Sequence, residues 1–373
     1  MLIGVPKEIK THEYRVGMTP NSVREAVCHG HQVLVQANAG LEIDLSDQDY
    51  VAAGAEIVDT PEEIFARAEL VIKVKEPQLG ECKMLREGQV LFTYLHLAPD
   101  PRQARALMDS GCVAIAYETV TDRFGGLPLL APMSEVAGRM AIQAGAHCLE
   151  MEQGGRGQLL GGVPGVPVGK VLILGGGVVG TNAARMAMGL EAHVTVLDNS
   201  VHRLQELDMQ FGPTLNTIFS TVSTIEEHVL QADLVVGAVL VPGAEAPRLI
   251  SEDMVKSMKR RSVLVDVAID QGGCVATARP TTHADPIYIK HDVVHYCVAN
   301  MPGAVARTST FALNNATLPF ILALADKGHH KALVDDVHLR NGLNVHMGEL
   351  TFEAVAEAIG AGYVAADQVL GLS

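Results

Sequence analysis

Tryptophan is absent from the 373-residue chain, and aromatic residues make up only 4% of it. Surfaces that stack nucleic-acid bases depend on aromatic side chains, so such a surface is not expected here. A surplus of basic residues is missing as well, because the formal net charge is −15. Nucleic acids and anionic membranes bind basic surfaces. The composition therefore argues against both as partners.

The chain also lacks a Cys-x-x-Cys pair, and its cysteines are scattered: Cys28, Cys82, Cys112, Cys148, Cys274 and Cys297. Isolated cysteines are typical of reduced thiols in the cytoplasm, and they form neither a disulfide framework nor a zinc site. The N-terminus turns polar within a few residues, so no secretory signal is expected. The longest charge-free stretch near the C-terminus, residues 308–325, contains Thr, Ser, Asn and Pro, which favours a buried helix over a membrane span. We therefore expect a cytoplasmic protein.

What the sequence does contain is a regular alternation of short β-rich runs and helical patterns. Apolar residues make up 48% of the chain, which is enough to fill two cores, and the length fits two domains. The alternation predicts βαβ units and largely parallel sheets that are covered on both faces. A Gly/Pro-rich loop at residues 154–170 interrupts the pattern before it resumes. We expect two α/β domains, with a helical C-terminus after about residue 305 that returns to the first of them.

The sharpest local signal is a glycine motif, in which Gly175, Gly177 and Gly180 follow a predicted strand and open a predicted helix. Such glycines allow a tight turn, close approach of the backbone to a pyrophosphate, and close packing of helix on strand. Asp198 ends the next strand, where a carboxylate accepts hydrogen bonds from ribose hydroxyls and repels a 2′-phosphate. This favours NAD over NADP, although Arg203 nearby weakens the preference. Asp198 could alternatively serve as a helix N-cap.

Several further segments carry a family resemblance. They are GVPKEIKTHEYRVGMTPNSV, LVIKVKEP, LFTYLHLAPD, APMSEVAGRMA, DVAIDQGGC, RPTTHADPIY and MPGAVARTSTFALNNATLP, in addition to the glycine motif with its flanking strands. Together they resemble the alanine dehydrogenase family, which shares its motifs with the α subunit of nicotinamide nucleotide transhydrogenase. The resemblance extends from residue 1 to about residue 365 in nearly constant register.

The resemblance implies a fold, an activity and an assembly. It implies two Rossmann-like, doubly wound parallel-sheet domains: a discontinuous substrate domain, residues 1–128 and 306–373, and an NAD-binding domain, residues 129–305. The implied activity is the reversible oxidative deamination of L-alanine to pyruvate and ammonia, with NAD as the hydride acceptor. The implied assembly is a homohexamer.

Pyruvate needs a cationic clamp for its carboxylate, a donor to its carbonyl and a group that transfers protons. Arg15 suits the clamp because guanidinium meets a carboxylate bidentately, although its position alone also fits a surface ion pair with Glu13 or Glu8. Lys75, at the expected end of the strand LVIKVK, suits the donor. Lys73 shares its face by the two-residue period of a strand. The resemblance selects Arg15 and Lys75 as substrate-binding residues.

For proton transfer, the resemblance selects His96 and Asp270. Histidine exchanges protons near neutral pH, and His96 opens a loop after a predicted strand. Asp270 is expected at the end of the strand LVDVAID, where it also fits a turn before two glycines. Asp266, inside the same expected strand, is the competing carboxylate.

The resemblance also implies the remaining cofactor contacts, and it bears on a metal. The cofactor-binding residues are Ser134, Gly175, Gly177, Val178, Val179, Gly180, Asp198, Arg203, Ser220, Val239, Leu240, Val267, Asp270, Arg279, Asn300 and Met301. Some family members hold magnesium between an acid that matches Glu118 and a histidine. Lys327 occupies the position of that histidine here, so we expect no metal. Ala276 stands where the family often has Glu, next to a loop near the cofactor.

Two other functions compete with alanine dehydrogenase. The first is the soluble NAD-binding α module of a proton-translocating transhydrogenase, which works docked to membrane partners; the absence of a membrane tail after the second substrate-domain segment argues against it. The second is a D-2-hydroxyacid dehydrogenase, which would place an Arg and a His–carboxylate pair after the glycine loop. The candidates there, Arg279 with His291 or His295, lack a matching context.

Overall fold

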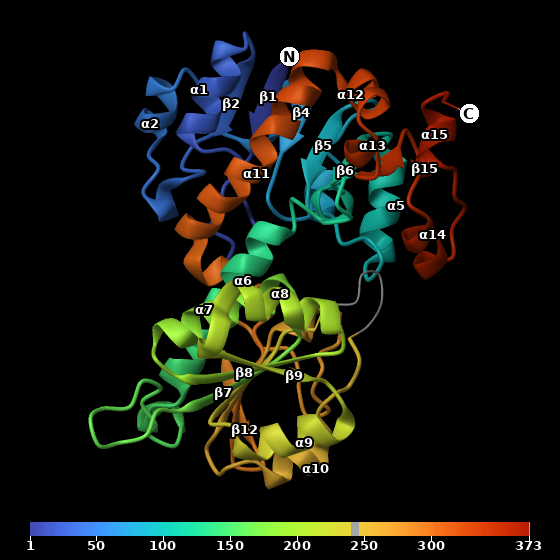
Figure 1. Ribbon diagram of the computed structural model, residues 1–373. Coiled ribbons are helices and arrows are strands. Elements are labelled where there is room, and N and C mark those ends of the chain that lie inside the picture. Colours follow the sequence, from blue (N-terminus) through green and yellow to red (C-terminus); the bar gives the residue numbers. More distant parts are fainter. Residues whose placement is uncertain (240–245, 373) are drawn as a thin grey trace. The chain divides into compact units, whose positions relative to one another are not determined.

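The computed structural model describes residues 1–239 and 246–372. The chain forms two compact units, which Figure 1 shows in different parts of its colour scale. Unit 1 consists of Met1–Met133 and Val305–Ser373, and unit 2 consists of Ser134–Ala304. Among the described residues, no helix is both long and apolar enough to cross a membrane.

Unit 1 is built on an eight-stranded sheet within the described chain. Its strands are β1 (Leu2–Val5), β2 (Gln32–Gln36), β3 (Glu56–Val58), β4 (Leu70–Ile72), β5 (Val90–Thr93), β6 (Val113–Ala116), β14 (Leu343–His346) and β15 (Glu349–Leu350). Their order is β15-β14-β6-β5-β4-β1-β2-β3. Strands β1 to β6 pair in parallel, whereas β14 pairs antiparallel with both β6 and β15.

Helices cover this sheet. They are α1 (Pro20–Cys28), α2 (Asp47–Ala52), α3 (Pro61–Arg67), α4 (Leu79–Cys82), α5 (Pro101–Ser110), α11 (Ala306–Lys327), α12 (His329–Asp335), α13 (Val337–Arg340), α14 (Glu353–Ile359) and α15 (Ala366–Val369), with 3-10 turns η1 (Leu41–Ile43) and η2 (Tyr117–Thr119). One apolar core joins the sheet to α3, α5 and α14 through residues such as Phe65, Leu91, Leu107 and Val355. Figure 1 shows α11 and α1 beside the strands of the same unit, where the two helices pack together.

Unit 2 holds a second sheet, seven-stranded in the described part of the chain. Its strands are β7 (Lys170–Leu174), β8 (His193–Asp198), β9 (Leu215–Phe219), β10 (Leu234–Gly237), β11 (Val263–Asp266), β12 (Ile287–Lys290) and β13 (Val293–Tyr296). Their order is β12-β13-β11-β10-β7-β8-β9, and only the edge strand β12 is antiparallel to its neighbour. Its helices and turns are α6 (Ala131–Cys148), α7 (Val178–Gly189), α8 (Val201–Phe211), α9 (Val222–Gln231), α10 (Glu252–Ser257), η3 (Met151–Gln153), η4 (Gly212–Thr214), η5 (Val267–Gln271) and η6 (Met301–Val305).

The predicted fold class, two doubly wound α/β units with largely parallel sheets, is confirmed. Local signals in the sequence explain several boundaries. Thr19 caps α1 by accepting the N–H of Ser22, and Pro20 occupies the first turn, where no donor is lost. Gly111 ends α5 with φ 68°, a conformation that glycine adopts without a steric penalty.

Two expected strand ends were wrong, and so was the expectation that the C-terminal region is helical throughout. Strand β4 ends at Ile72, three residues before Lys75, and β11 ends at Asp266, four residues before Asp270. Just beyond each strand a buried carboxylate accepts a backbone N–H: Glu8 accepts that of Val74, and Asp266 accepts that of Ala268. The C-terminal region is not purely helical either, since β14 and β15 extend the sheet of unit 1.

Candidate active site

In unit 1, the two predicted substrate-binding residues and the predicted proton-transfer histidine lie on loops at one edge of the sheet. Strands β5, β4 and β1 are neighbours and run parallel, so their carboxyl ends share an edge. Arg15 follows β1, Lys75 follows β4 and His96 follows β5. The fold therefore gathers two cations and a histidine from distant parts of the sequence.

Arg15 is buried, with 2% of its surface exposed, and it is paired with Glu13. Its Nε and Nη2 donate to the two carboxylate oxygens of Glu13, each at 2.6 Å, and Nη1 lies 3.1 Å from Met133 Sδ. Burial opposes both charges, but the ion pair outweighs it: the pKa of Arg15 is raised and that of Glu13 is lowered. The sequence position of Arg15 also fitted a surface ion pair with Glu13. The structure contains this ion pair in the interior, where it fixes the orientation of the guanidinium plane.

Lys73 and Lys75 have different surroundings. Lys73 is fully buried, and its Nζ donates to Glu81 at 2.8 Å and to Glu8 at 3.2 Å. Burial disfavours the Lys73 charge, but the two carboxylates outweigh it and raise the pKa. Lys75 is partly exposed, and its backbone N–H reaches Glu8 at 3.3 Å. Lys73 is therefore structural, and Lys75 remains the predicted substrate residue.

His96 has an exposed side chain and a constrained backbone. Its φ is 48°, which is unusual for a residue with a Cβ and costs about 1–3 kcal/mol. Glu118 Oε1 accepts the His96 N–H at 2.7 Å and lies 3.9 Å from Nδ1. The imidazole stacks on Tyr94, with 5.8 Å between ring centroids and 8° between planes. Glu118 thus fixes the backbone of His96, and Tyr94 packs against its imidazole.

Charge interactions connect these residues within unit 1. Burial raises the pKa of Tyr94, whose hydroxyl donates to the Leu129 carbonyl at 2.5 Å, and the nearby charge of Arg15 works against that rise. The charge of Lys75 similarly helps to lower the pKa of Glu13. The sequence did not predict Tyr94, the positioning role of Glu13, or the pairing of Glu8 with Lys73. The available signal was that Glu8 and Glu13 lie in the same loop as Arg15 and that Tyr94 lies two residues before His96.

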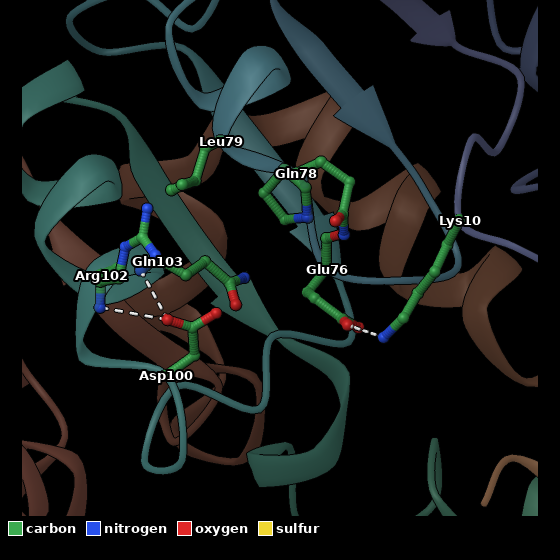
Figure 2. A pocket seen from close by; sticks show the side chains of 8 residues that line it. Lys10, Glu76, Gln78, Leu79, Asp100, Arg102 and Gln103 are labelled. Carbon is green, nitrogen blue, oxygen red and sulfur yellow. Dashed lines mark hydrogen bonds and ion pairs between the residues drawn. The ribbon is translucent and has the colours of Figure 1, made fainter.

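A cavity of about 300 Å³ opens beside these loops in unit 1. Figure 2 shows Lys10 reaching Glu76 on one side, and Asp100 accepting the backbone N–H groups of Arg102 and Gln103 on the other. Its walls are mostly polar, and no predicted site residue is among the described residues that line it. Glu76, which lines the cavity, directly follows Lys75, whose charge helps to lower the pKa of Glu76.

In unit 2, the predicted cofactor residues follow the carboxyl ends of the parallel strands. The strand order reverses between β7 and β10, which is where ligands bind in open α/β sheets. The glycine motif follows β7, Ser220 follows β9, Val239 follows β10, and Asn300 and Met301 follow β13. Asp198 ends β8. The predicted cofactor residues therefore lie along the carboxyl edge of the sheet that contains the switch point.

The glycine loop itself is shaped for close approach. Gly175 has φ 96°, and a Cβ built on Gly180 would lie 1.8 Å from the Gly175 carbonyl oxygen. Gly177 caps the twelve-residue α7, and both Gly177 and Val178 are exposed, while Val179 is half-buried. A helix N-terminus presents N–H groups and a positive dipole to an anion. The loop fits the pyrophosphate of a dinucleotide.

The two carboxylates after β11 have different environments. Asp266 is fully buried, and it accepts N–H groups from Ala268, Cys274 and Val275 at 3.1, 2.9 and 3.3 Å. Burial raises its pKa to about 6, and these hydrogen bonds limit the rise. Asp270 is exposed in η5, the turn that Asp266 holds. Asp270 therefore remains the predicted reacting group.

The other predicted cofactor residues have varied surroundings. Ser134, in the first turns of α6, is half-buried, as are Val239 and Val267, whereas Met301 is buried. Arg279 is exposed and lies over the Tyr288 ring, 4.2 Å from its centroid. Asn300 has φ 67°, and its carbonyl oxygen is 3.0 Å from His283 Nε2. Leu240 lies outside the described residues.

The residues considered for a metal are engaged in protein contacts. Glu118 binds the backbone of Leu95 and His96, and Lys327 Nζ lies 2.9 Å from Asp335. Ala276 is exposed, two residues after Cys274. Across residues 1–239 and 246–372, no group of three or more His, Cys, Asp or Glu side chains is arranged to hold a metal ion.

Fold and site together define a class of two-domain α/β proteins with a dinucleotide-type glycine loop at the switch point of one sheet. The chain matches the model of the alanine dehydrogenase/PNT N-terminal domain over residues 4–137 and that of the C-terminal domain over residues 141–353. It belongs to the alanine dehydrogenase/PNT family, as the sequence motifs predicted.

Individual relatives agree with this assignment. The chain is 61% identical over 371 residues to alanine dehydrogenase of Halomonas elongata, with 100% of both chains covered. A solved L-alanine dehydrogenase structure matches 96% of this chain and 99% of its own, with a TM-score of 0.94 and 52% identity. A transhydrogenase from Sinorhizobium meliloti matches 95% of this chain and 100% of its own, with a TM-score of 0.79 and 24% identity, which shows a shared fold.

Proposed function

We propose that this chain is an NAD-dependent L-alanine dehydrogenase. The reaction converts L-alanine, NAD⁺ and water into pyruvate, ammonium, NADH and a proton, and it is reversible. The observation that carries the proposal is the gathering of Arg15, Lys75 and His96 at one edge of the unit 1 sheet. Full-length relatives named alanine dehydrogenase support the same activity.

Each unit contributes one part of the chemistry. The substrate domain, residues 1–128 with 306–373, lies within unit 1. Residues 129–305 form the cofactor domain, which contains all of unit 2. NAD, bound at the glycine loop, supplies the hydride acceptor. Arg15 binds the substrate carboxylate, with Glu13 fixing the guanidinium plane. Lys75 donates to the keto oxygen and stabilises negative charge there.

His96 and Asp270 move the protons. In the direction of amination, His96 protonates the carbonyl oxygen of pyruvate while ammonia adds to the carbon. Asp270 accepts a proton from the attacking ammonia, and the two residues together assist the loss of water. The exposed His96 side chain, with its backbone fixed by Glu118, suits a group that must reach a ligand.

A direct assay tests the function. The purified chain should reduce NAD in the presence of L-alanine, and serine, glycine and lactate should support this reaction more weakly. A transhydrogenase module would not reduce NAD with alanine by itself, and a hydroxyacid dehydrogenase would prefer lactate. Absence of alanine-dependent NADH formation, in a preparation that binds NADH, would rule the proposal out.

We also infer a cytoplasmic homohexamer whose ligands are alanine, pyruvate, ammonia and NAD. The loop at 154–170 supports self-association, because Leu159, Val163 and Val166 expose more than half of their surface, while a backbone bridge pairs Val163 with Val166. Exposed apolar patches are typical of protein interfaces. Light scattering should give six times the chain mass, and Val166→Asp should lower it. A monomeric wild-type chain would contradict the inference.

A further inference from the structure

Asp198 and the glycine loop are joined in one array. The carboxylate of Asp198 accepts the N–H of Gly176 at Oδ2, 2.7 Å away, and the N–H of Ser200 at Oδ1, 2.8 Å away. A Cβ built on Gly176 would lie 3.3 Å from Asp198 Oδ2 and 3.4 Å from Arg203 Cγ. Asp198 and Arg203 thus lie beside the same glycine. If Asp198 binds the adenosine ribose, a 2′-phosphate on that ribose would lie close to Arg203.

All three nitrogens of the Arg203 guanidinium have protein partners. Nε donates to the Gly176 carbonyl at 2.6 Å, Nη2 donates to Thr181 Oγ1 at 2.6 Å, and Nη1 donates to Glu206 Oε2 at 2.5 Å. Two of these partners belong to the glycine loop and the start of α7. The guanidinium is therefore anchored against the loop.

Glu206 supplies the charge in this arrangement. It lies one turn after Arg203 on α8, and His202 Nδ1 is 3.5 Å from its other carboxylate oxygen. The hydrogen bond from Arg203 lowers the pKa of Glu206, so the carboxylate is ionised at neutral pH. The pair adds no net positive charge beside Asp198, although an isolated arginine there would attract a 2′-phosphate.

We propose that Glu206 is a cofactor-specificity residue, which holds and neutralises Arg203 so that this arginine does not serve as the partner of a 2′-phosphate. The inference rests on the proposed function, because it takes the adenosine ribose of NAD to bind at Asp198. The inference assigns the discrimination against NADP to two carboxylates, Asp198 and Glu206. The sequence position of Arg203 suggested that this arginine weakens the preference for NAD, and its pairing with Glu206 cancels that effect.

The test measures binding, so it does not depend on turnover. Dissociation constants of NADH and NADPH are determined by the fluorescence of the reduced nicotinamide, for the wild-type chain, Glu206→Gln and Asp208→Asn. Asp208 is an exposed acid on the same helix and controls for net charge. In Glu206→Gln, the ratio of the NADPH constant to the NADH constant should fall about three- to tenfold, as expected for one uncovered charge. In Asp208→Asn, the ratio should not change.

A double variant tests the route through Arg203. In Arg203→Gln/Glu206→Gln, the gain in NADPH binding should disappear. An unchanged ratio in Glu206→Gln, an equal fall in Asp208→Asn, or a gain that survives in the double variant would each overturn the inference. If the wild-type chain bound neither nucleotide, the proposed function itself would fail, whereas NADH binding with an unmoved ratio would refute only the role of Glu206.

Discussion

The carboxylate of Asp266 accepts the backbone N–H of Cys274 at 2.9 Å, across the turn that carries Asp270. It also lies 3.6 Å from the Cys274 thiol, and a Cβ built on Gly273 would lie 2.7 Å from it. Asp266 is therefore enclosed by the loop that it holds, while Asp270 faces solvent. We therefore expect Asp266 to position the turn and Asp270 to carry the chemistry.

Asp270→Asn should lower kcat about 100- to 10,000-fold, because the amide cannot accept the proton that ammonia releases. The NADH dissociation constant should change much less than kcat, because Asp270 is only one of many predicted cofactor contacts. Steady-state kinetics and nucleotide binding measure the two quantities. Turnover at the wild-type rate would remove Asp270 from the mechanism.

Asp266 should make the folded state less stable as pH rises. Its folded pKa of about 6 exceeds the ordinary 3.8, so the folded chain holds an extra proton between these values. The stabilisation is complete below pH 3.8 and is lost as pH rises through 6. Relative to Asp266→Asn, the wild-type free energy of unfolding should fall by about 1 kcal/mol from pH 5 to pH 7. Urea titrations at fixed protein concentration measure the free energy of unfolding of both proteins. If the difference between wild type and Asp266→Asn did not change with pH, the raised pKa of Asp266 would be contradicted.

Lys73→Met and Lys75→Met should have opposite consequences. Loss of Lys73 leaves Glu8 and Glu81 buried without a cation, and it should destabilise the fold by about 3–5 kcal/mol. Loss of Lys75 should lower kcat/KM about 100-fold with little change in stability. Denaturant unfolding and steady-state kinetics distinguish the two. Equal effects on stability would contradict the separate roles.

This pair of lysines shows how far the sequence could predict the site. Alternation predicted Lys73 and Lys75 on one face of a strand, but the strand ends at Ile72, and Glu8 binds the backbone N–H groups of Val74 and Lys75 beyond it. Contacts between residues so far apart in sequence leave no periodic signal. The glycine loop after β7, by contrast, was predicted correctly as a strand–turn–helix, since its information is local.

The C-terminal strands and the Arg203 contacts were missed for a similar reason. Strand β14 pairs with β6 across most of the chain, and a four-residue run carries too little pattern to predict that pairing. Gly176 and Thr181, two partners of Arg203, lie on a different segment from α8, so the sequence position of Arg203 suggested an available cation where the fold has an anchored one. Glu206, three residues after Arg203 on the same helix, is a local i,i+3 partner that the sequence could have indicated.

Arg15→Lys should raise KM for alanine and pyruvate at least about tenfold, because an ammonium cannot hold Glu13 at two points, as the guanidinium does through Nε and Nη2, and still present a second edge to the substrate carboxylate. Arg67→Lys is the matched control, since Arg67 forms a similar two-point pair with Glu56 on the exposed surface. That control should leave KM unchanged. An unchanged KM in Arg15→Lys would assign this arginine to structure, through Glu13, and not to substrate binding.

His96→Asn tests the proton-transfer group without adding backbone strain, because asparagine tolerates the left-handed conformation that His96 adopts at φ 48°. The variant should lose about 100- to 10,000-fold in kcat, since asparagine cannot exchange a proton near neutral pH. NADH affinity should be nearly intact, because unit 2 carries the predicted cofactor contacts. His147→Asn, at an exposed histidine of α6, should retain full activity. Wild-type turnover in His96→Asn would show that the acid–base assignment is wrong, and it would transfer the proton chemistry to another group at the same sheet edge.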